Sequence, residues 1–200
     1  MSQFENLKMK SALLVCFLCL ICASAIAQVS FGVKGGVNFN EMVYTPVPKG
    51  FSIDNNSGIG FHLGFYSSLK IGQNFLFIPE LQLSQRGVSV SSGGSTSNFN
   101  IHYLELPLLF SYRLKKLGLD IGPNISFRIS SKVDVYEGFD FGLNGGLRFD
   151  LTERFFLTGR YYYGLTDIST IEFRDPFNNL LTRTGERSRS VQFGIGYKIK

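Results

Sequence analysis

Large apolar residues occupy every second position in one stretch of this 200-residue chain, and this alternation is the strongest constraint on its fold. In FGLNGGLRFDL, residues 141–151, the apolar positions are Phe141, Leu143, Leu147, Phe149 and Leu151. Glycine, asparagine, arginine and aspartate residues separate them. Because successive side chains of a strand point to opposite sides, the pattern predicts a strand with one apolar and one polar face.

The same alternation recurs in eight segments, and their length is informative. We place them at residues 29–39, 59–71, 75–86, 101–114, 117–129, 139–151, 155–166 and 190–199. Strands of soluble proteins usually have about five or six residues. A tilted strand that crosses a membrane needs about nine to eleven. The segment lengths therefore favour membrane-crossing strands.

Short and long links alternate between these segments. The short links are residues 72–74, 115–116 and 152–154; the long links are residues 40–58, 87–100, 130–138 and 167–189. Eight hairpin-linked strands with tight turns at one end and long loops at the other are typical of outer-membrane barrels. Both ends of the mature chain would lie on the tight-turn side, which is periplasmic in such barrels.

The polar faces of the segments cannot meet lipid. They carry Lys34, Lys70, Arg86, Arg113, Arg128, Arg148, Arg160 and Lys198. A basic residue facing lipid costs about 2–4 kcal/mol at mid-depth and less near the interfaces. Even with allowance for depth, these residues would rival a folding free energy of about 5–15 kcal/mol. The polar faces therefore line the lumen of a membrane barrel or cover the outside of a soluble barrel of the lipocalin type.

Glycine residues favour the membrane barrel over the soluble one. Gly32, Gly64 and Gly122 are among the many glycines on the polar faces. Glycine weakens a solvated strand, whereas inside an eight-stranded barrel, small residues leave room for long charged side chains. With the sorting of the links, this predicts an all-β fold: an eight-stranded antiparallel transmembrane up-and-down β-barrel.

Buried charges need partners, so we predict a network of ion pairs in the lumen. Its members are Lys34, Lys70, Glu80, Arg86, Glu105, Arg113, Asp120, Arg128, Asp140, Arg148, Asp150, Arg160 and Lys198. Glu80 and Glu105 fall on neighbouring strands, and we expect them to pair with Arg86, Arg113 or Arg128. A proton relay through the same carboxylates is the alternative.

Outward-facing aromatic residues form two predicted bands, as is typical of outer-membrane barrels. The band near the turns contains Phe31, Phe75, Tyr112, Phe149, Phe155 and Tyr197. The band near the loops contains Phe39, Phe61, Phe127, Phe139 and Tyr163.

The first 27 residues have the pattern of a secretory signal peptide. A basic start is followed by an apolar run and by Ala25-Ile26-Ala27, a small-x-small cleavage pattern. We therefore expect a signal peptide at 1–27 and a barrel domain at 28–200. All three cysteines lie in the expected signal peptide, so the mature chain would have neither a disulfide nor a thiolate metal site. The net charge of +5 comes from scattered residues, and nucleic-acid binding is not expected.

Four motifs occur in order along the chain: FIPELQLSQRG (77–87), YLELPLLFSYRL (103–114), LDIGPNISF (119–127) and RYYYGLTDI (160–168). They resemble the PorT-like outer-membrane β-barrel family of Bacteroidetes-type bacteria, and the match covers residues 28–200. The resemblance implies an outer-membrane barrel with periplasmic termini, and it supplies no catalytic residues. Such chains commonly end in an aromatic residue that the barrel assembly machinery reads, whereas this one ends Tyr197-Lys198-Ile199-Lys200, so Tyr197 would take that part.

Three functions remain open on the sequence. The first is a structural or interaction barrel with a lumen filled by side chains, whose outer loops contact lipopolysaccharide or a partner protein. The second is a narrow pore or small-solute transporter, which eight strands disfavour because they leave no aqueous channel in the usual case. The third is a lipid-modifying enzyme that uses His62 or His102, the only histidines. We expect the first, with no catalytic, cofactor-binding or metal-binding residues.

The composition of two of the long links predicts how each of them behaves. SVSSGGSTSNFN, residues 89–100, has the composition of a mobile outer loop. The 167–189 link mixes apolar residues with Arg174, Arg183, Arg187 and Arg189, so we expect it to contact lipid headgroups or a protein partner.

Overall fold

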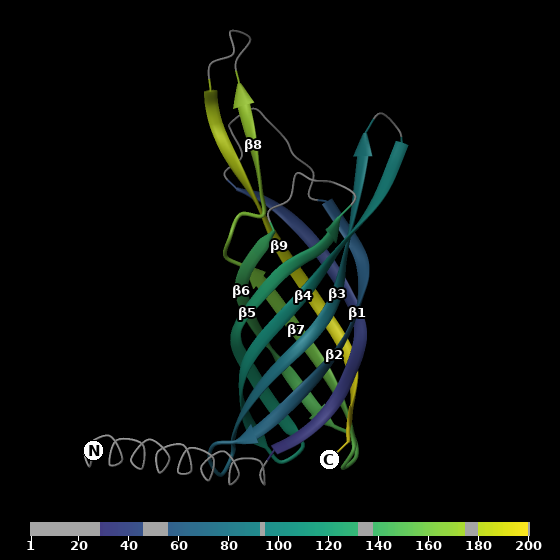
Figure 1. Ribbon diagram of the computed structural model, residues 1–200, viewed down its shortest axis with the longest axis vertical. Helices are drawn as coiled ribbons and strands as arrows, with labels where there is room; N and C mark the ends of the chain where they lie inside the picture. The colour runs from purple at the N-terminus through teal and green to yellow at the C-terminus, as the bar shows by residue number, and fades with distance from the viewer. Residues whose placement is uncertain (1–28, 46–55, 93–94, 132–137, 175–179, 200) are drawn as a thin grey trace, which may run out of the picture.

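The computed structural model describes residues 29–45, 56–92, 95–131, 138–174 and 180–199, and the expected signal peptide lies outside these residues. Figure 1 shows a tall barrel of tilted strands. The strands are β1 (Val29–Thr45), β2 (Asn56–Lys70), β3 (Phe75–Ser92), β4 (Ser95–Leu114), β5 (Leu117–Ser131), β6 (Phe139–Asp150), β7 (Phe155–Gly164), β8 (Ser169–Arg174) and β9 (Leu180–Lys198).

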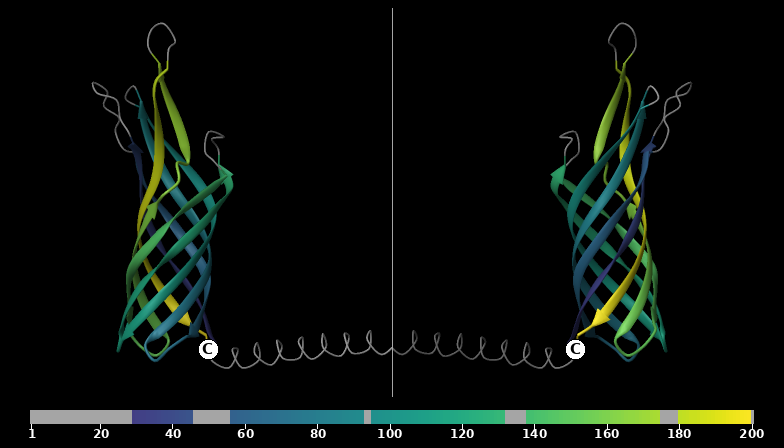
Figure 2. Two further views of the ribbon diagram at one scale, coloured as in Figure 1. Left: turned by 90° about the vertical axis from the view of Figure 1, so that its left-hand side faces the viewer. Right: turned by 90° about the vertical axis from the view of Figure 1, so that its right-hand side faces the viewer.

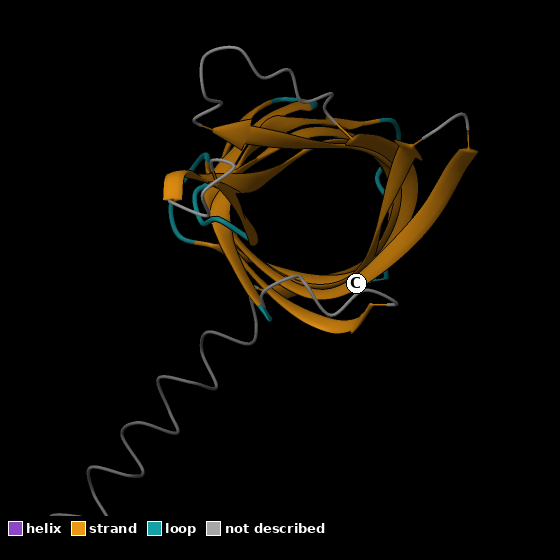
Figure 3. Ribbon diagram, turned by 90° about the horizontal axis from the view of Figure 1, so that it is seen from above, coloured by secondary structure: helices purple, strands orange, loops and turns teal. Residues whose placement is uncertain are grey.

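Eight of these strands close the barrel. Each of β1 to β6 pairs antiparallel with the next strand, and β7 pairs with β9 from Phe155↔Tyr197 to Tyr163↔Arg189. The other edge of β9 pairs with β1 from Gly32↔Lys198 to Thr45↔Gly185. Seen from above, the strands form a closed ring (Figure 3). The predicted eight-stranded antiparallel barrel is confirmed.

The predicted short turns lie together at one end of the barrel. Residues 71–74, 115–116 and 151–154 connect the three tight hairpins. Lys115 has a φ of 53°, the left-handed conformation that a two-residue hairpin turn requires. The backbone N–H of Ile199 donates to the Phe31 carbonyl at 2.8 Å, so both ends of the barrel domain lie at this end.

The other end differs from the prediction, because much of the expected loop structure is strand. The β3–β4 ladder continues from Gly87↔Asn100 to Ser92↔Ser95, through the segment expected to be a mobile loop. Within the 167–189 link, β8 pairs with the first part of β9 from Ser169↔Glu186 to Arg174↔Leu180. Both hairpins stand above the barrel (Figure 2). Their apolar alternation is short, with Val88 and Val90 in one hairpin and Ile171 and Phe173 in the other, inside serine-rich or charged sequence.

The two faces of the wall have opposite character. The side chains of Phe65 and Ile121 are about two-thirds exposed, at 65% and 64%, and point outward. Arg86 and Glu105 point inward and are each 1% exposed. The apolar faces therefore surround the barrel and the polar faces fill it. Among the described residues, no helix has the length and apolar character needed to cross a membrane.

Candidate functional site

An apolar layer fills the lumen near the turn end. Tyr66, Ile78, Leu109 and Phe156 are buried together, with Leu76 packed against them. The rings of Tyr66 and Phe156 meet edge to face, with 5.4 Å between centroids. On the ring of Phe156 lies the guanidinium of Arg148, 3.4 Å from the centroid, and its Nε donates to Asp150 Oδ1 at 2.9 Å. This layer separates the central lumen from the turn end.

A buried group of charges lies above this layer. Glu80 accepts two hydrogen bonds from Arg160, and its other partner is the ammonium group of Lys34. Arg160 Nη2 also contacts Asp120 Oδ2 at 3.4 Å. Two cations and two anions thus neutralise one another, as buried charges require. The sequence prediction for Glu80 was wrong in its partners, because its cations come from β1 and β7 rather than from Arg86, Arg113 or Arg128.

Arg86 organises the next group of polar residues. Its Nη2 contacts Glu105 Oε1 at 2.8 Å and its Nη1 contacts Asp140 Oδ2 at 2.7 Å. The guanidinium lies over the rings of Tyr103 and Tyr162, at 4.3 Å and 4.7 Å from their centroids. The pairing of Glu105 with Arg86 was among the three expected alternatives. The contribution of the tyrosines was not foreseen, because it depends on which aromatic rings the closed barrel brings together.

A second apolar layer covers the lumen at the hairpin end. Met42, Ile101, Tyr103 and Ile168 form a fully buried cluster. Ile168 comes from the link between β7 and β8, whose Thr166 hydroxyl donates to Asp140 Oδ1 at 2.9 Å. The same link carries Asp167, which pairs with Arg187 on β9 at 2.7 Å. This short link therefore folds over the lumen and is held there by the polar contacts of Thr166 and Asp167 and by the backbone N–H of Ile168, which donates to the Glu186 carbonyl at 2.8 Å.

The remaining predicted members of the network lie toward the ends of the barrel. Arg113 contacts Asp150 at 3.7 Å, and the Asp150 side chain is one-third exposed. Lys70 is exposed, whereas Arg128 and Lys198 are half-buried. The structure thus brings Lys34, Glu80, Asp120 and Arg160 into one group, and Arg86, Glu105 and Asp140 into another. It places Lys70, Arg128 and Lys198 outside these two groups.

The two histidines lie in different environments. His62 points into the lumen, where its Nδ1 is 2.6 Å from Asn38 Oδ1. The amide of Asn38 donates to the Ser84 hydroxyl at 2.9 Å. His102 is exposed on the outward face of β4. Within the described ranges, no three His, Cys, Asp or Glu side chains gather in a way that could hold a metal ion.

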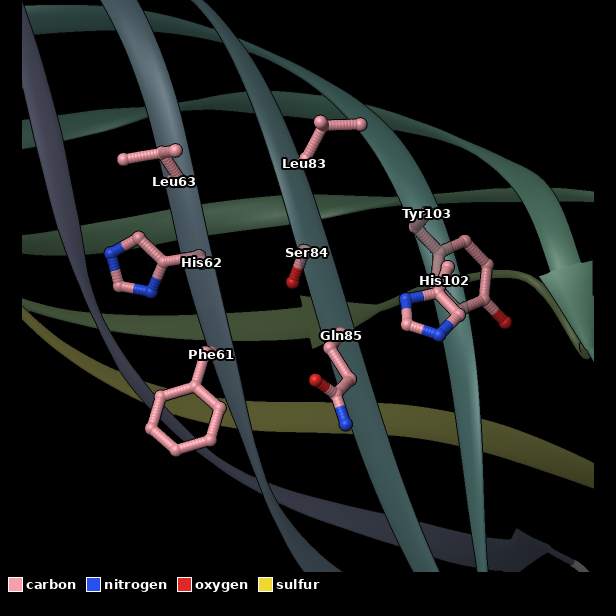
Figure 4. A pocket seen from close by; sticks show the side chains of 8 residues that line it. All are labelled: Phe61, His62, Leu63, Leu83, Ser84, Gln85, His102 and Tyr103. Carbon is pink, nitrogen blue, oxygen red and sulfur yellow. The ribbon is translucent and has the colours of Figure 1, made fainter.

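A hollow of about 240 Å³ lies in the wall where β2, β3 and β4 run side by side. It is lined by Phe61, His62, Leu63, Leu83, Ser84, Gln85, His102 and Tyr103, which Figure 4 shows on these three strands. Phe61, Leu63 and Leu83 are exposed outward, so the hollow opens on the outer surface of the barrel. In the described residues, β2–β3 pairing ends at His62↔Ser84, although β2 continues to Asn56 and β3 to Ser92. The hollow lies where this ladder ends.

Polar side chains form a row along the edge of this hollow, and two of them, Gln85 and His102, also line it. Gln85 pairs with His102 across the β3–β4 ladder, and His102 pairs with Ser130 across the β4–β5 ladder. Directly opposed residues share a face of the sheet, so all three side chains face outward with His102. A register shift between His102 and Tyr103 brings Ser130 into this position. One step toward the turns, the corresponding row is apolar: Leu83, Leu104 and Phe127.

The chain matches a known family and known structures. A family model described as "Outer membrane protein beta-barrel domain" matches residues 22–170. The structure of Neisserial surface protein A is similar, with a TM-score of 0.52 and 13% identity over 84% of this chain and 97% of that chain. The Ail protein of Yersinia pestis, solved with the heparin analogue sucrose octasulfate, has a TM-score of 0.50 and 13% identity over 86% and 99% of the two chains. No curated protein matches the sequence.

Proposed function

Because this chain belongs to the outer membrane protein β-barrel domain family, we propose that it is an outer-membrane barrel with a closed lumen and a structural or interaction role. The observation that carries this proposal is the filling of the lumen. Buried charged groups lie between an apolar layer at the turn end and another at the hairpin end. A solute would have to displace both apolar layers as well as the ion pairs.

The balance of lumenal charge supports a closed barrel. Lys34, Arg86, Arg113, Arg148 and Arg160 contribute five positive charges to the ion pairs of the lumen. Glu80, Glu105, Asp120, Asp140 and Asp150 contribute five negative charges to the same pairs. A water-filled selective pore usually has an excess of one sign. This pairing instead suits a packed interior, as expected for eight strands.

The proposal also covers the orientation of the barrel in the membrane and the subgroup of the family to which the chain belongs. We propose that both mature termini are periplasmic, because short turns face the periplasm in barrels of this type. The β3–β4 and β8–β9 hairpins then project from the cell. The four PorT-like motifs support a place in that subgroup from Bacteroidetes-type bacteria, with a signal peptide at 1–27 and Tyr197 as the residue read by the barrel assembly machinery. We propose no catalytic role.

The β8–β9 hairpin is the part of the barrel that we propose to contact lipopolysaccharide or a partner protein. Its Arg183 pairs with Glu172 at 3.0 Å, and both side chains remain accessible. Arg189 lies over the ring of Tyr163 with 5.2 Å to the centroid, at the upper end of the barrel wall. Arginine and aromatic side chains are enriched among residues that dominate protein interfaces.

Conductance in planar bilayers tests the closed lumen. We expect the purified wild-type barrel to give no stable openings, because two apolar layers interrupt any water path. A double variant, Met42→Ser with Ile168→Ser, weakens only one of these layers and should also stay closed, because the other layer and the ion pairs remain. Stable openings of the wild type would contradict the proposal and favour the narrow pore.

The interaction role is tested by capture of partners on the native barrel. Residues 171–183 are replaced by a short Gly/Ser link, which keeps the part of β9 that pairs with β1. The matched control replaces residues 88–99 of the β3–β4 hairpin. We expect loss of the captured partner only in the first variant. Equal capture by the wild type and both variants would remove the β8–β9 hairpin from the proposal.

A further inference from the structure

We propose that the hollow on the outer wall and the polar row at its edge form a binding site for one molecule of lipid A, the membrane anchor of lipopolysaccharide. The site consists of the apolar Leu63 and Leu83, of Phe61 beside Gln85, and of the polar Gln85, His102 and Ser130. It depends on the proposed orientation, in which the hairpin end of the barrel faces the outer leaflet.

The position of the hollow on the outer surface indicates that its ligand is apolar. The wall around it belongs to the exposed apolar surface of the barrel, with Phe61 60% and Leu63 64% exposed. In an outer-membrane barrel this surface faces hydrocarbon. A volume of about 240 Å³ is smaller than the usual range of about 300–1,000 Å³ for a compact ligand. A segment of an acyl chain fits both the location and the size.

The hollow coincides with the end of the β2–β3 ladder. The β3–β4 hairpin continues upward as a complete ladder to Ser92↔Ser95, whereas β2 and β3 stop pairing at His62↔Ser84. The backbone pairing that would close the wall is therefore absent above this point in the described residues. Phe61 and Leu63 line the hollow on the β2 side and Leu83 lines it on the β3 side, so its outward part is largely apolar, with Gln85 and His102 at the edge.

The polar row indicates which part of the lipid lies next to the acyl chain that occupies the hollow. Gln85, His102 and Ser130 offer amide, imidazole and hydroxyl donors, and the three are neutral or weakly basic. Ester and amide carbonyl oxygens, where acyl chains join a headgroup, match such donors. The row lies one step above the apolar Leu83, Leu104 and Phe127, so polar donors adjoin an apolar surface on β3, β4 and β5.

The width of the row favours lipid A over a glycerophospholipid. Neighbouring strands lie about 4.7–4.9 Å apart, so Gln85 and Ser130, two strands apart, are separated by about 10 Å. A glycerol backbone holds its two ester groups close together. The disaccharide of lipid A distributes several ester and amide carbonyls over a wider headgroup, which can reach donors along the whole row.

Native mass spectrometry of the full-length mature barrel tests the site, with added lipid A and, separately, a glycerophospholipid of similar chain length. Leu83→Trp fills the hollow without changing the polar row. Leu157→Trp is the matched control, since Leu157 is an exposed outward leucine on β7, away from the hollow. Gln85→Leu with His102→Leu removes two donors of the row and keeps side chains of similar size at these two positions of the lining.

We expect wild type to retain one lipid A with a defined apparent Kd. Leu83→Trp and the double leucine variant should each raise this Kd by about tenfold or more, and Leu157→Trp should leave it unchanged. Equal retention by wild type and Leu83→Trp would overturn the site. Equal affinity for the glycerophospholipid would overturn its assignment to lipid A. Planar-bilayer conductance of the same preparations reports separately on the closed lumen, so failure of the lipid site is distinguished from failure of the proposed function.

Discussion

Arg160 on β7 and Glu80 on β3 form a two-pronged ion pair, although 80 residues separate them in the chain. The distances are 2.7 Å from Nη1 to Oε2 and 2.8 Å from Nη2 to Oε1. Such parallel hydrogen bonds combine charge with a fixed geometry. The strands that carry the two residues are not neighbours in the wall, so the pair crosses the lumen and connects opposite sides of the barrel.

Removing one partner of this pair should destabilise the barrel strongly. In Glu80→Gln, Arg160 and Lys34 stay buried without their shared anion, and we expect a loss of about 3–5 kcal/mol in the free energy of unfolding. Urea unfolding in lipid vesicles measures it. The control is Glu172→Gln, which breaks the exposed pair with Arg183 and should cost at most about 1 kcal/mol. The double variant Glu80→Leu with Arg160→Leu should lose less than the two single changes together, and an additive loss would contradict the coupling.

The alternation of residues was enough to predict the barrel, its eight strands and the direction in which Phe65, Arg86 and Ile121 point. It was not enough to predict the β8–β9 hairpin or the extension of β3 and β4. Those segments project above the barrel, and their short apolar alternations, Val88 with Val90 and Ile171 with Phe173, are embedded in serine-rich or charged sequence. The partners of Glu80 were also missed, because they depend on how strongly tilted strands bring β1, β3 and β7 together across the lumen. The order of the hairpins predicts which strands are neighbours in the wall. It does not predict which side chains meet across the lumen.

Gly64 and Gly145 lie on opposite faces of the barrel wall, so substitution by valine should affect folding at one position and not at the other. A Cβ at Gly64, which faces the lumen, would lie 2.7 Å from the Leu81 carbonyl oxygen and 3.0 Å from Gln82 Cα. Because both atoms belong to the backbone, Gly64→Val should prevent folding or reduce its yield severely. Gly145 faces outward and has no atom within 4 Å of an added Cβ, so Gly145→Val should fold normally. Heat-modifiable migration in gels measures the folded fraction, and similar yields for both variants would contradict the inward packing of Gly64.

The link between β7 and β8 should contribute to stability through Ile168. This side chain is fully buried with Met42, Ile101 and Tyr103, so Ile168→Ala should cost about 2–5 kcal/mol. Thr166→Val removes the hydrogen bond to Asp140 and should cost about 1–3 kcal/mol. Urea unfolding in vesicles measures both. Leu165→Ala, at an exposed neighbouring position, is the control and should have the smallest effect of the three. An order in which Leu165→Ala costs most would mean that the link does not cover the lumen.

Arginine placed at two heights on the outer wall should reveal the membrane boundary. Ile121 lies near the middle of the outward row of β5, with Leu117 and Leu119 on one side and Phe127 and Ile129 on the other. At this depth Ile121→Arg should cost about 2–4 kcal/mol, whereas Gln85→Arg, in the polar row, should cost at most about 1 kcal/mol. Ile121→Leu controls for the change in shape. The measurement is urea unfolding in vesicles, repeated in a bilayer with longer acyl chains. In the thicker bilayer the cost at Gln85 should rise because hydrocarbon then approaches the polar row, while the cost at Ile121 should change little. Equal costs at both positions in the thinner bilayer would place the row of Gln85, His102 and Ser130 inside the hydrocarbon.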